Sequence, residues 1–251
     1  MEPPLTASTL YLVATPIGNL EDITLRALRV LKECDVVAAE DTRRSGQLLK
    51  HFGISKPLLS YFQFNEAKRS EEIIARLQRG EKVALVTDAG TPGISDPGER
   101  VVKAAVAAGF RVESIPGACA LITALTASGL PTGEFHFIGF LPHKSGQRRK
   151  KLESLKSFSG TLVLYESPYR VEKLLGELNE VFPERMVVLA RELTKKFEQF
   201  VRGKPAELLA MVKKLKGEFV VLISPADGDE PEGREEAETE NAEDQVGNNP
   251  I

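Results

Sequence analysis

A short apolar strand that ends in a glycine- and proline-rich loop is the feature that most constrains how this chain folds. Residues 83–87 form a β-branched apolar run, which is typical of a buried strand in a parallel sheet. The loop that follows, 88–98, contains seven Asp, Gly and Pro residues, which end a strand and leave the backbone open to close approach. Ligands of open α/β sheets bind at the carboxyl ends of strands. We therefore interpret this loop as part of a binding site; an ordinary strand-to-helix turn is the alternative.

Strands and helices alternate through the first half of the chain. The expected strands are 10–14, 36–39, 58–61, 83–87 and 111–115, and the expected helices are 24–34, 42–51, 66–79, 98–108 and 116–128. This order predicts an α/β domain with a mostly parallel sheet covered by helices on both faces.

The second half has a different pattern and begins after residues 129–133, where two glycines and a proline interrupt the preceding helix. The expected strands are 135–139, 160–165, 186–191, 197–202 and 219–224, and the expected helices are 145–158, 168–182 and 205–215. The consecutive strands 186–191 and 197–202 indicate an antiparallel pair and hence a mixed sheet. We predict two α/β domains, 1–132 and 133–225.

Charge is distributed unevenly along the chain. The 251 residues have a net charge of −3, but residues 226–251 hold ten acids and one base, a charge of −9, which leaves +6 for residues 1–225. A segment with so few apolar residues and so much charge is expected to be a disordered acidic tail. The basic remainder permits a polyanionic partner.

Composition narrows the class of protein further. No run of apolar residues is long enough to span a membrane and the first residues do not resemble a signal peptide, so we expect a cytoplasmic protein without a membrane partner. Cys34 and Cys119 are interpreted as buried free thiols. The three histidines have no metal-ligand spacing, so we expect no metal.

Four loops that follow predicted strands share the same chemistry: 14–20, 39–44, 88–98 and 116–120. In a parallel sheet all four lie at the carboxyl edge, where they would line a cleft. The chain contains no Gly-x-Gly, no Gly-x-x-x-x-Gly-Lys-Ser/Thr and no Gly-x-Ser-x-Gly. A dinucleotide fold, a P-loop and a hydrolase nucleophile elbow are therefore not indicated.

Six long motifs carry a family resemblance that spans roughly residues 9–224. They read VATPIGNLEDIT (13–24), AEDTR (39–43), DAGTPGISDPG (88–98), FIGFLP (137–142), YESPYR (165–170) and ARELTK (190–195). The chain resembles the ribosomal RNA small subunit methyltransferase I family of the tetrapyrrole methylase superfamily. The resemblance implies S-adenosyl-L-methionine-dependent 2′-O-methylation of a decoding-region cytidine in 16S rRNA within the 30S subunit, a cofactor cleft between the domains and a homodimer. Tyr169 departs from the family, which often has His there.

The four loops and the resemblance together predict the cofactor site. We expect S-adenosylmethionine to contact Pro16, Gly18, Asp88, Gly90, Thr91, Pro92, Ile94, Ser95, Gly117, Ala118 and Tyr165. This cofactor carries no phosphate, so the missing phosphate-binding motifs agree with it.

Charged residues in the second half are candidates for catalysis and RNA contact. Glu166 and Lys195 lie near strand ends, and either could take the proton of a ribose hydroxyl; a structural ion-pair cluster is the alternative. The run 143–151 holds five basic residues, which suits RNA phosphates or simply a solvated helix face. The RNA-contact candidates are Arg43, Arg44, Lys144, Arg148, Arg149, Lys150, Lys151 and Arg170.

Two other functions remain open at this point. One is methylation of a small tetrapyrrole of the corrin or sirohaem type, which the basic segment disfavours. The other is a non-catalytic RNA-binding factor of ribosome assembly, which would bind the cofactor without turnover.

Overall fold

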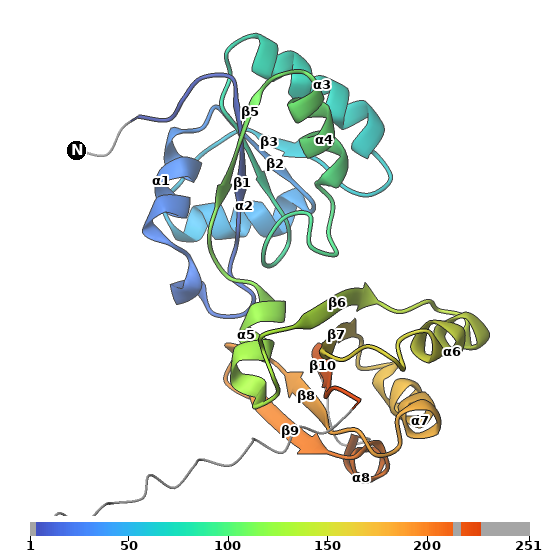
Figure 1. The fold of residues 1–251 in the computed structure, drawn as a ribbon. Helices are drawn as coiled ribbons and strands as arrows, with labels where there is room; N and C mark the ends of the chain where they lie inside the picture. The colour runs from blue at the N-terminus through green and yellow to red at the C-terminus, as the bar shows by residue number, and fades with distance from the viewer. Residues whose placement is uncertain (1–3, 213–216, 227–251) are drawn as a thin grey trace, which may run out of the picture.

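Two five-stranded sheets that follow one another along the chain form the fold (Figure 1). The structure is a computed structural model and describes residues 4–212 and 217–226. The predicted acidic tail, apart from Ala226, and the last residues of the predicted helix 205–215 lie outside the described residues. The predicted class, an α/β fold with one parallel and one mixed sheet, is confirmed.

The first sheet is parallel throughout, with the strand order β3-β2-β4-β1-β5. Its strands are β1 (Thr9–Val13), β2 (Val36–Ala39), β3 (Leu58–Ser60), β4 (Val83–Val86) and β5 (Arg111–Ile115). The central strands β2 and β4 are buried along their whole length, which explains their uninterrupted apolar sequences.

Helices cover both faces of this sheet, as the alternating pattern predicts (Figure 1). The helices are α1 (Leu25–Glu33), α2 (Thr42–His51), α3 (Glu66–Gln78) and α4 (Glu99–Ala107), with the short 3-10 helix η1 (Leu20–Asp22) before α1. Helices α1 and α2 pack on the face that carries Tyr11 and Val13, and α3 and α4 pack on the face that carries Leu10. Side chains of β1 therefore alternate between two cores.

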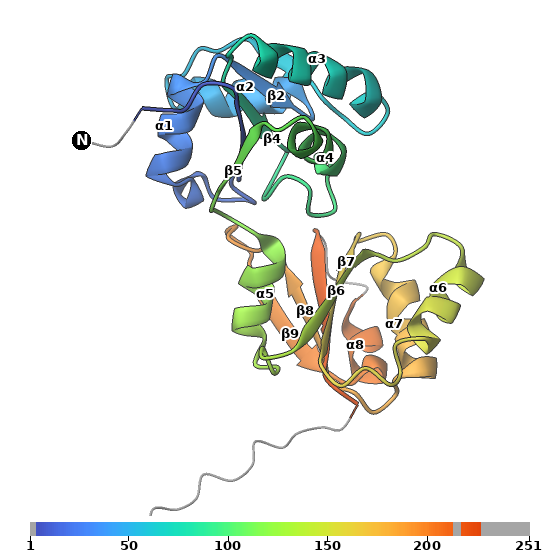
Figure 2. The same cartoon turned by 45° about the horizontal axis from the view of Figure 1, so that its top comes forward.

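The second sheet is mixed, with the order β6-β7-β10-β8-β9. Its strands are β6 (Phe135–Phe140), β7 (Thr161–Glu166), β8 (Val187–Arg191), β9 (Gln199–Gly203) and β10 (Phe219–Ile223). Only β6 and β7 are parallel, and β8 and β9 form the expected antiparallel pair. Helices α6 (Ser145–Glu153), α7 (Val171–Val181) and α8 (Pro205–Val212) cover one face (Figure 2).

Helix α5 (Ala120–Ser128) covers the other face of the second sheet, where Leu121, Ala124 and Leu125 join the core formed by β8 and β10. This helix precedes residue 132 in sequence, yet it packs on the second sheet (Figure 2). The domain limits 1–132 and 133–225 stay a prediction.

Helix α6 is shorter than its sequence predicts. It ends at Glu153, not at residue 158, and residues 154–157 form turns. The Ser154 hydroxyl donates to the carbonyl of Lys151 at 2.7 Å, a local bond that competes with helix continuation. Among the described residues, no helix has the length and apolar character needed to cross a membrane.

Candidate functional site

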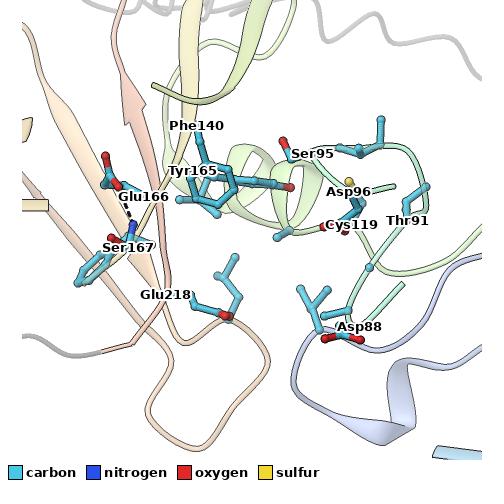
Figure 3. A pocket seen from close by; sticks show the side chains of 18 of the residues that line it. Asp88, Thr91, Ser95, Asp96, Cys119, Phe140, Tyr165, Glu166, Ser167 and Glu218 are labelled. Atoms are coloured by element: carbon cyan, nitrogen blue, oxygen red, sulfur yellow. Dashed lines mark hydrogen bonds between the residues drawn. The ribbon is translucent and has the colours of Figure 1, made fainter. Parts of the chain in front are cut away.

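A pocket of about 410 Å³ lies between the two sheets. All four predicted loops contribute to one wall, through residues such as Ile17, Glu40, Asp88 and Cys119. The second sheet supplies the opposite wall from the ends of β6 and β7, the residues after β8 and the start of β10 (Figure 3). This volume and mixture of apolar and polar lining suit a small organic ligand.

The loops meet because the parallel strands end at one edge. Thr15 and Gly90 exchange backbone hydrogen bonds of 2.9 Å in each direction, which joins the loop after β1 to the loop after β4. The Thr91 hydroxyl donates to the carbonyl of Ala118 at 3.1 Å, which adds the loop after β5. The Asp41 backbone N–H donates to Asp88 Oδ1 at 3.1 Å, which adds the loop after β2.

Gly90 is the glycine whose backbone conformation this site requires. Its φ is +87°, in the left-handed region, and a Cβ there would lie 3.4 Å from Ile17 Cγ2. Ser95, later in the same loop, adopts φ +62° although it has a side chain, which indicates a tightly constrained loop.

The two domains also approach each other closely at two glycines beside the pocket. A Cβ on Gly18 would lie 2.5 Å from Lys195 Cγ, and one on Gly139 would lie 2.8 Å from Ser95 Oγ. Gly139 follows an irregularity in β6 that begins at Phe137. These contacts fix how closely the loops of one domain approach the strands of the other.

We expect Gly18→Ala to lower the free energy of unfolding by about 1–3 kcal/mol, because its methyl group would overlap the chain around Lys195. Gly146→Ala is the matched control, since nothing lies within 4 Å of a Cβ at that helical position. Urea denaturation of both variants tests this. Equal stability of the Gly18 variant and the wild type would show that the interdomain contact is loose.

The predicted cofactor residues fall into two groups. The pocket is lined by Asp88, Gly90, Thr91, Ile94, Ser95 and Tyr165. Pro16, Gly18, Pro92, Gly117 and Ala118 are not among the lining residues. Several of these support the loops, since a Cβ on Gly117 would lie 2.8 Å from Ala14 Cβ, and the Ala118 carbonyl accepts the bond from Thr91. Their assignment as ligand contacts stays a prediction.

Acidic side chains outnumber basic ones in the pocket. The acids are Glu40, Asp88, Asp96, Glu166, Glu192 and Glu218, and the bases are Arg44 and Lys195. Of these, sequence analysis named Asp88, Glu166, Arg44 and Lys195 as site residues; Glu40, Asp96 and Glu192 lie in motifs that it singled out, and Glu218 was missed. Asp96 lies within the predicted loop, so its position was available, but its surroundings depend on the folded arrangement of both domains.

Burial and repulsion between neighbouring carboxylates raise the pKa of two of these acids. Burial raises the pKa of Glu40, and the neighbouring Asp88 carboxylate adds to the rise. Burial also raises the pKa of Asp96, to about 7, and Glu40, Asp88 and Glu218 act in the same direction. The pocket therefore disfavours further negative charge and suits a positively charged ligand.

Both predicted catalytic residues are held in ion pairs. Glu166 is buried and its Oε1 lies 3.1 Å from Arg170 Nε, while the Ser167 backbone N–H donates to the same oxygen at 2.8 Å. Lys195 Nζ lies 3.1 Å from Glu192 Oε1 and 3.7 Å from Glu218 Oε2. These contacts would hold the side chains that line this wall of the pocket in place. A role of Glu166 or Lys195 in proton transfer stays a prediction.

Arg148 corrects the predicted RNA-contact set. It is 4% exposed, its Nε lies 2.5 Å from Glu177 Oε2, and it donates to the carbonyls of Pro142 and His143. A guanidinium held in this way is part of the packing between α6 and α7. Sequence analysis misread it because a basic run gives no sign of which member turns inward.

The other RNA candidates lie in different surroundings. Arg43 and Arg44 are exposed and pair with Asp41 and Asp88, and Arg43 holds the pKa of Asp41 well below its usual value. Lys144, Arg149 and Lys150 are exposed on or beside α6, and Lys151 is half-buried. The Arg170 guanidinium donates to the Leu141 carbonyl at 2.8 Å and contacts His143 Nδ1.

The two cysteines differ in how deeply they are buried. Cys34 is buried, and burial raises the pKa of its thiol to about 11, whereas Cys119 is only partly buried and lines the pocket. Both are free. Within the described residues, no group of three or more His, Cys, Asp or Glu side chains is arranged to hold a metal ion. The absence of a metal stays a prediction.

Comparison with known proteins assigns this architecture to a family. Residues 9–209 match the family of tetrapyrrole (corrin/porphyrin) methylases. The ribosomal RNA small subunit methyltransferase I of Pseudomonas aeruginosa is 51% identical over 237 residues, 92% of this chain and 83% of the relative. That of Halalkalibacterium halodurans is 49% identical over 217 residues, 86% of this chain and 75% of the relative.

A solved structure shows the same fold at lower sequence similarity. The uroporphyrin-III C-methyltransferase of Thermus thermophilus, in complex with S-adenosylhomocysteine, has a TM-score of 0.61 and 21% sequence identity. The match covers 86% of this chain and 97% of that one.

Proposed function

This chain belongs to the ribosomal RNA small subunit methyltransferase I family of the tetrapyrrole methylases, and from that premise we propose that it methylates the 2′-hydroxyl of a cytidine in the decoding region of 16S rRNA. At the coarser level it is an S-adenosylmethionine-dependent rRNA methyltransferase. The observation that carries the proposal is the interdomain pocket, in which all four loops and the second sheet converge.

The lining of the pocket fits S-adenosylmethionine. The cofactor contains a sulfonium cation, and the pocket has six carboxylates against two basic groups. Ile17, Ile94 and Leu193 supply apolar surface for an adenosine, and the loop around Gly90 offers backbone groups where side chains are absent. We propose that the lining residues among the predicted set are the ones that contact the cofactor.

When bound, S-adenosylmethionine supplies an already activated methyl group. The chain then has two tasks, which are to hold the acceptor hydroxyl in line and to remove its proton. We propose that the Glu166–Arg170 ion pair holds the pocket wall at the end of β7. The ion pairs of Lys195 with Glu192 and Glu218 would hold the wall formed by Glu192 and Leu193. Positioning of this kind can supply several kcal/mol of the barrier.

The exposed basic side chains at the edge of the pocket (Arg44) and outside it are the proposed RNA contacts. Arg43, Arg44, Lys144, Arg149 and Lys150 all keep exposed side chains, whereas the pocket itself is acidic. We propose that these basic side chains bind phosphates of the rRNA within the 30S subunit, while a single nucleotide reaches the pocket.

We expect the triple variant Lys144→Ala, Arg149→Ala, Lys150→Ala to weaken rRNA binding and to flatten its salt dependence by about 2–3 in the slope of log K against log salt, because each lost phosphate contact releases about one counterion fewer. Cofactor affinity should not change, since these residues lie outside the pocket lining. Filter binding to 30S subunits across a salt series measures the effect.

A charge-matched triple variant provides the control. Lys32, Lys50 and Lys68 are exposed on α1, α2 and α3, and their replacement by Ala removes the same charge from the first domain. Equal losses of rRNA affinity in the two triple variants would mean that binding depends only on the net charge of the protein and that α6 is not a docking site.

We propose that the protein acts as a homodimer in the cytoplasm. Leu20 and Leu25, at η1 and the start of α1, are 41% and 86% exposed, which is apolar surface that a second copy could cover. Light scattering at several concentrations tests the oligomeric state; a monomer at all of them would contradict it.

The modified atom can be identified directly. We expect rRNA treated with the enzyme and S-adenosylmethionine to yield 2′-O-methylcytidine on nuclease digestion and mass spectrometry, with the adjacent phosphodiester resistant to alkali. A methyl group on a base, or on another nucleoside, would contradict the proposed specificity while leaving the rRNA methyltransferase activity in place.

A further inference from the structure

Two exposed phenylalanines follow β3 and have no part in the pocket. Phe62 and Phe64 lie in the loop that joins β3 to α3 (Figure 1), where they are 38% and 88% exposed. Neither is among the residues that line the pocket. A phenyl ring left in water forgoes the stabilisation that burial provides. Two such rings side by side therefore offer apolar surface to a partner.

The loop holds this aromatic pair in a fixed position. Asn65 Oδ1 accepts from the Phe62 backbone N–H at 2.8 Å, and Asn65 Nδ2 donates to the Ser60 carbonyl at 3.2 Å. The two rings pack edge to face, with their centroids 6.3 Å apart. Because the rings are ordered before a partner arrives, binding costs them little conformational entropy.

Hydrogen bonds also join this loop to the loops of the pocket. The Tyr61 backbone N–H donates to the Ala39 carbonyl at 2.8 Å, and the next residue, Glu40, lines the pocket. Glu66 Oε1 accepts from the Tyr61 hydroxyl at 3.1 Å and from the Gly98 backbone N–H at 3.2 Å. Gly98 ends the glycine- and proline-rich loop after β4. The aromatic pair therefore has a fixed place relative to the pocket.

The distance from the aromatic pair to the pocket suits a short stretch of single-stranded RNA. In the first sheet only β2 separates β3 from β4. Neighbouring strands lie about 4.8 Å apart, so the ends of β3 and β4 are separated by about 10 Å. Stacked bases of one strand are about 3.4 Å apart, so about three nucleotides span this separation. Neighbours of a nucleotide in the pocket can thus reach the rings.

The charge beside the aromatic pair indicates the chemistry of its partner. Arg43 and Arg44 are exposed at the start of α2, and α2 follows the strand that pairs with β3. Guanidinium groups bind phosphates, and aromatic rings stack on unpaired bases. A single-stranded nucleic acid uses both groups, whereas an apolar protein surface would leave the two arginines without a role.

We propose that Phe62 and Phe64 form a stacking platform for an unpaired rRNA base next to the nucleotide that enters the pocket, an inference that rests on the proposed function. Phe64, the more exposed of the two, presents its ring to the base, and Phe62 supports it from the side. Arg43 and Arg44 bind the phosphates between the platform and the pocket. Since every base has a π-face, the platform adds affinity with little sequence preference.

A fluorescence experiment tests the stacking without any methyl transfer. The chain contains no tryptophan, so Phe64→Trp introduces a single indole at the platform. We expect decacytidylate at low salt to quench its fluorescence saturably, because the indole stacks on a base. Inorganic polyphosphate is the control, since it binds the arginines but carries no base and should leave the fluorescence unchanged. Absence of quenching by decacytidylate would overturn the proposal.

Binding to 30S subunits separates stacking from a general apolar contact. Phe64→Ala should weaken binding by about 5- to 150-fold, and Phe64→Tyr should stay within about threefold of the wild type. Phe64→Leu keeps an apolar side chain without a ring, so it should lose about as much affinity as Phe64→Ala. A leucine variant that binds as the wild type does would indicate an apolar contact with a protein and would overturn the proposal.

Three further results separate this proposal from the proposed function. If the wild type methylates rRNA and Phe64→Ala binds 30S subunits equally well, the platform is refuted and the function stands. If Phe64→Ala lowers the oligomeric mass in light scattering, the rings lie at a subunit interface, which also overturns the proposal. If the wild type transfers no methyl group to rRNA while decacytidylate quenches Phe64→Trp, the proposed function fails and the platform stands as an RNA contact.

Discussion

Gly90→Val is expected to weaken S-adenosylmethionine binding by about 10- to 100-fold. Valine is β-branched and strongly disfavours the φ of +87° at this position. Relief of that strain would break the two hydrogen bonds with Thr15, each worth about 1 kcal/mol, and open the junction between the loops after β1 and β4. Isothermal titration calorimetry measures the loss, because about 1.4 kcal/mol corresponds to tenfold in affinity.

Gly80→Val is the matched control for this experiment. Gly80 has nearly the same φ, +86°, but nothing lies within 4 Å of a Cβ there, and it lies in the turn before β4, away from the pocket. The control should lose stability without losing cofactor affinity. If both valine variants bind the cofactor as the wild type does, the loop 88–98 does not form the cofactor site.

Arg148→Ala is expected to lower the free energy of unfolding by about 3–5 kcal/mol, the largest stability effect that we predict. The substitution leaves the buried carboxylate of Glu177 without its cation. It also removes the donors to the carbonyls of Pro142 and His143, which join the end of β6 to α6. Urea denaturation with the linear-extrapolation analysis gives the change directly.

Replacement of the neighbouring Arg149 shows how much of the effect is due to burial, because it removes the same charge from an exposed position. Arg149 pairs with Glu180 on the exposed surface, so Arg149→Ala should cost no more than about 1 kcal/mol. The double variant Arg148→Met, Glu177→Leu should recover much of the stability, because an apolar pair avoids burying charge. A loss below about 1 kcal/mol in Arg148→Ala would show that the buried pair contributes little and would reopen its predicted RNA contact.

The first domain was predictable from sequence because its strands are parallel and buried. β2, α2 and β5 have the predicted limits, and the other strands of this sheet lie within one residue of theirs. Parallel strands also end at one edge, so the convergence of the four loops followed from the order of elements alone. Thr24 caps α1 as a threonine before an amphipathic run suggests, its hydroxyl accepting from the Ala27 N–H.

The second wall of the pocket was less predictable because it depends on how the two sheets pack together. Glu218 immediately precedes β10 and Glu192 follows β8, and nothing local distinguishes either from a surface acid. Their role appears only when Gly18 meets Lys195 across the domains. Local patterns also could not foresee that Arg148 turns inward, since its partner Glu177 lies 29 residues away on another helix.

The same limit applies to Asp96. Its place in a glycine- and proline-rich loop was visible, but its pKa is raised first by burial and then by Glu40 and Glu218, which come from two other elements and from both domains. A sequence shows which titratable groups are present, whereas the burial and charge that tune them arise from tertiary packing.

The most direct test of the central claim is transfer of a labelled methyl group from S-adenosylmethionine to 30S subunits that lack the modification, with uroporphyrinogen III as the competing acceptor. We predict stoichiometric labelling of the 16S rRNA at a single cytidine ribose and none of the tetrapyrrole. Labelling of the tetrapyrrole alone, or cofactor binding without transfer to any subunit, would contradict the account.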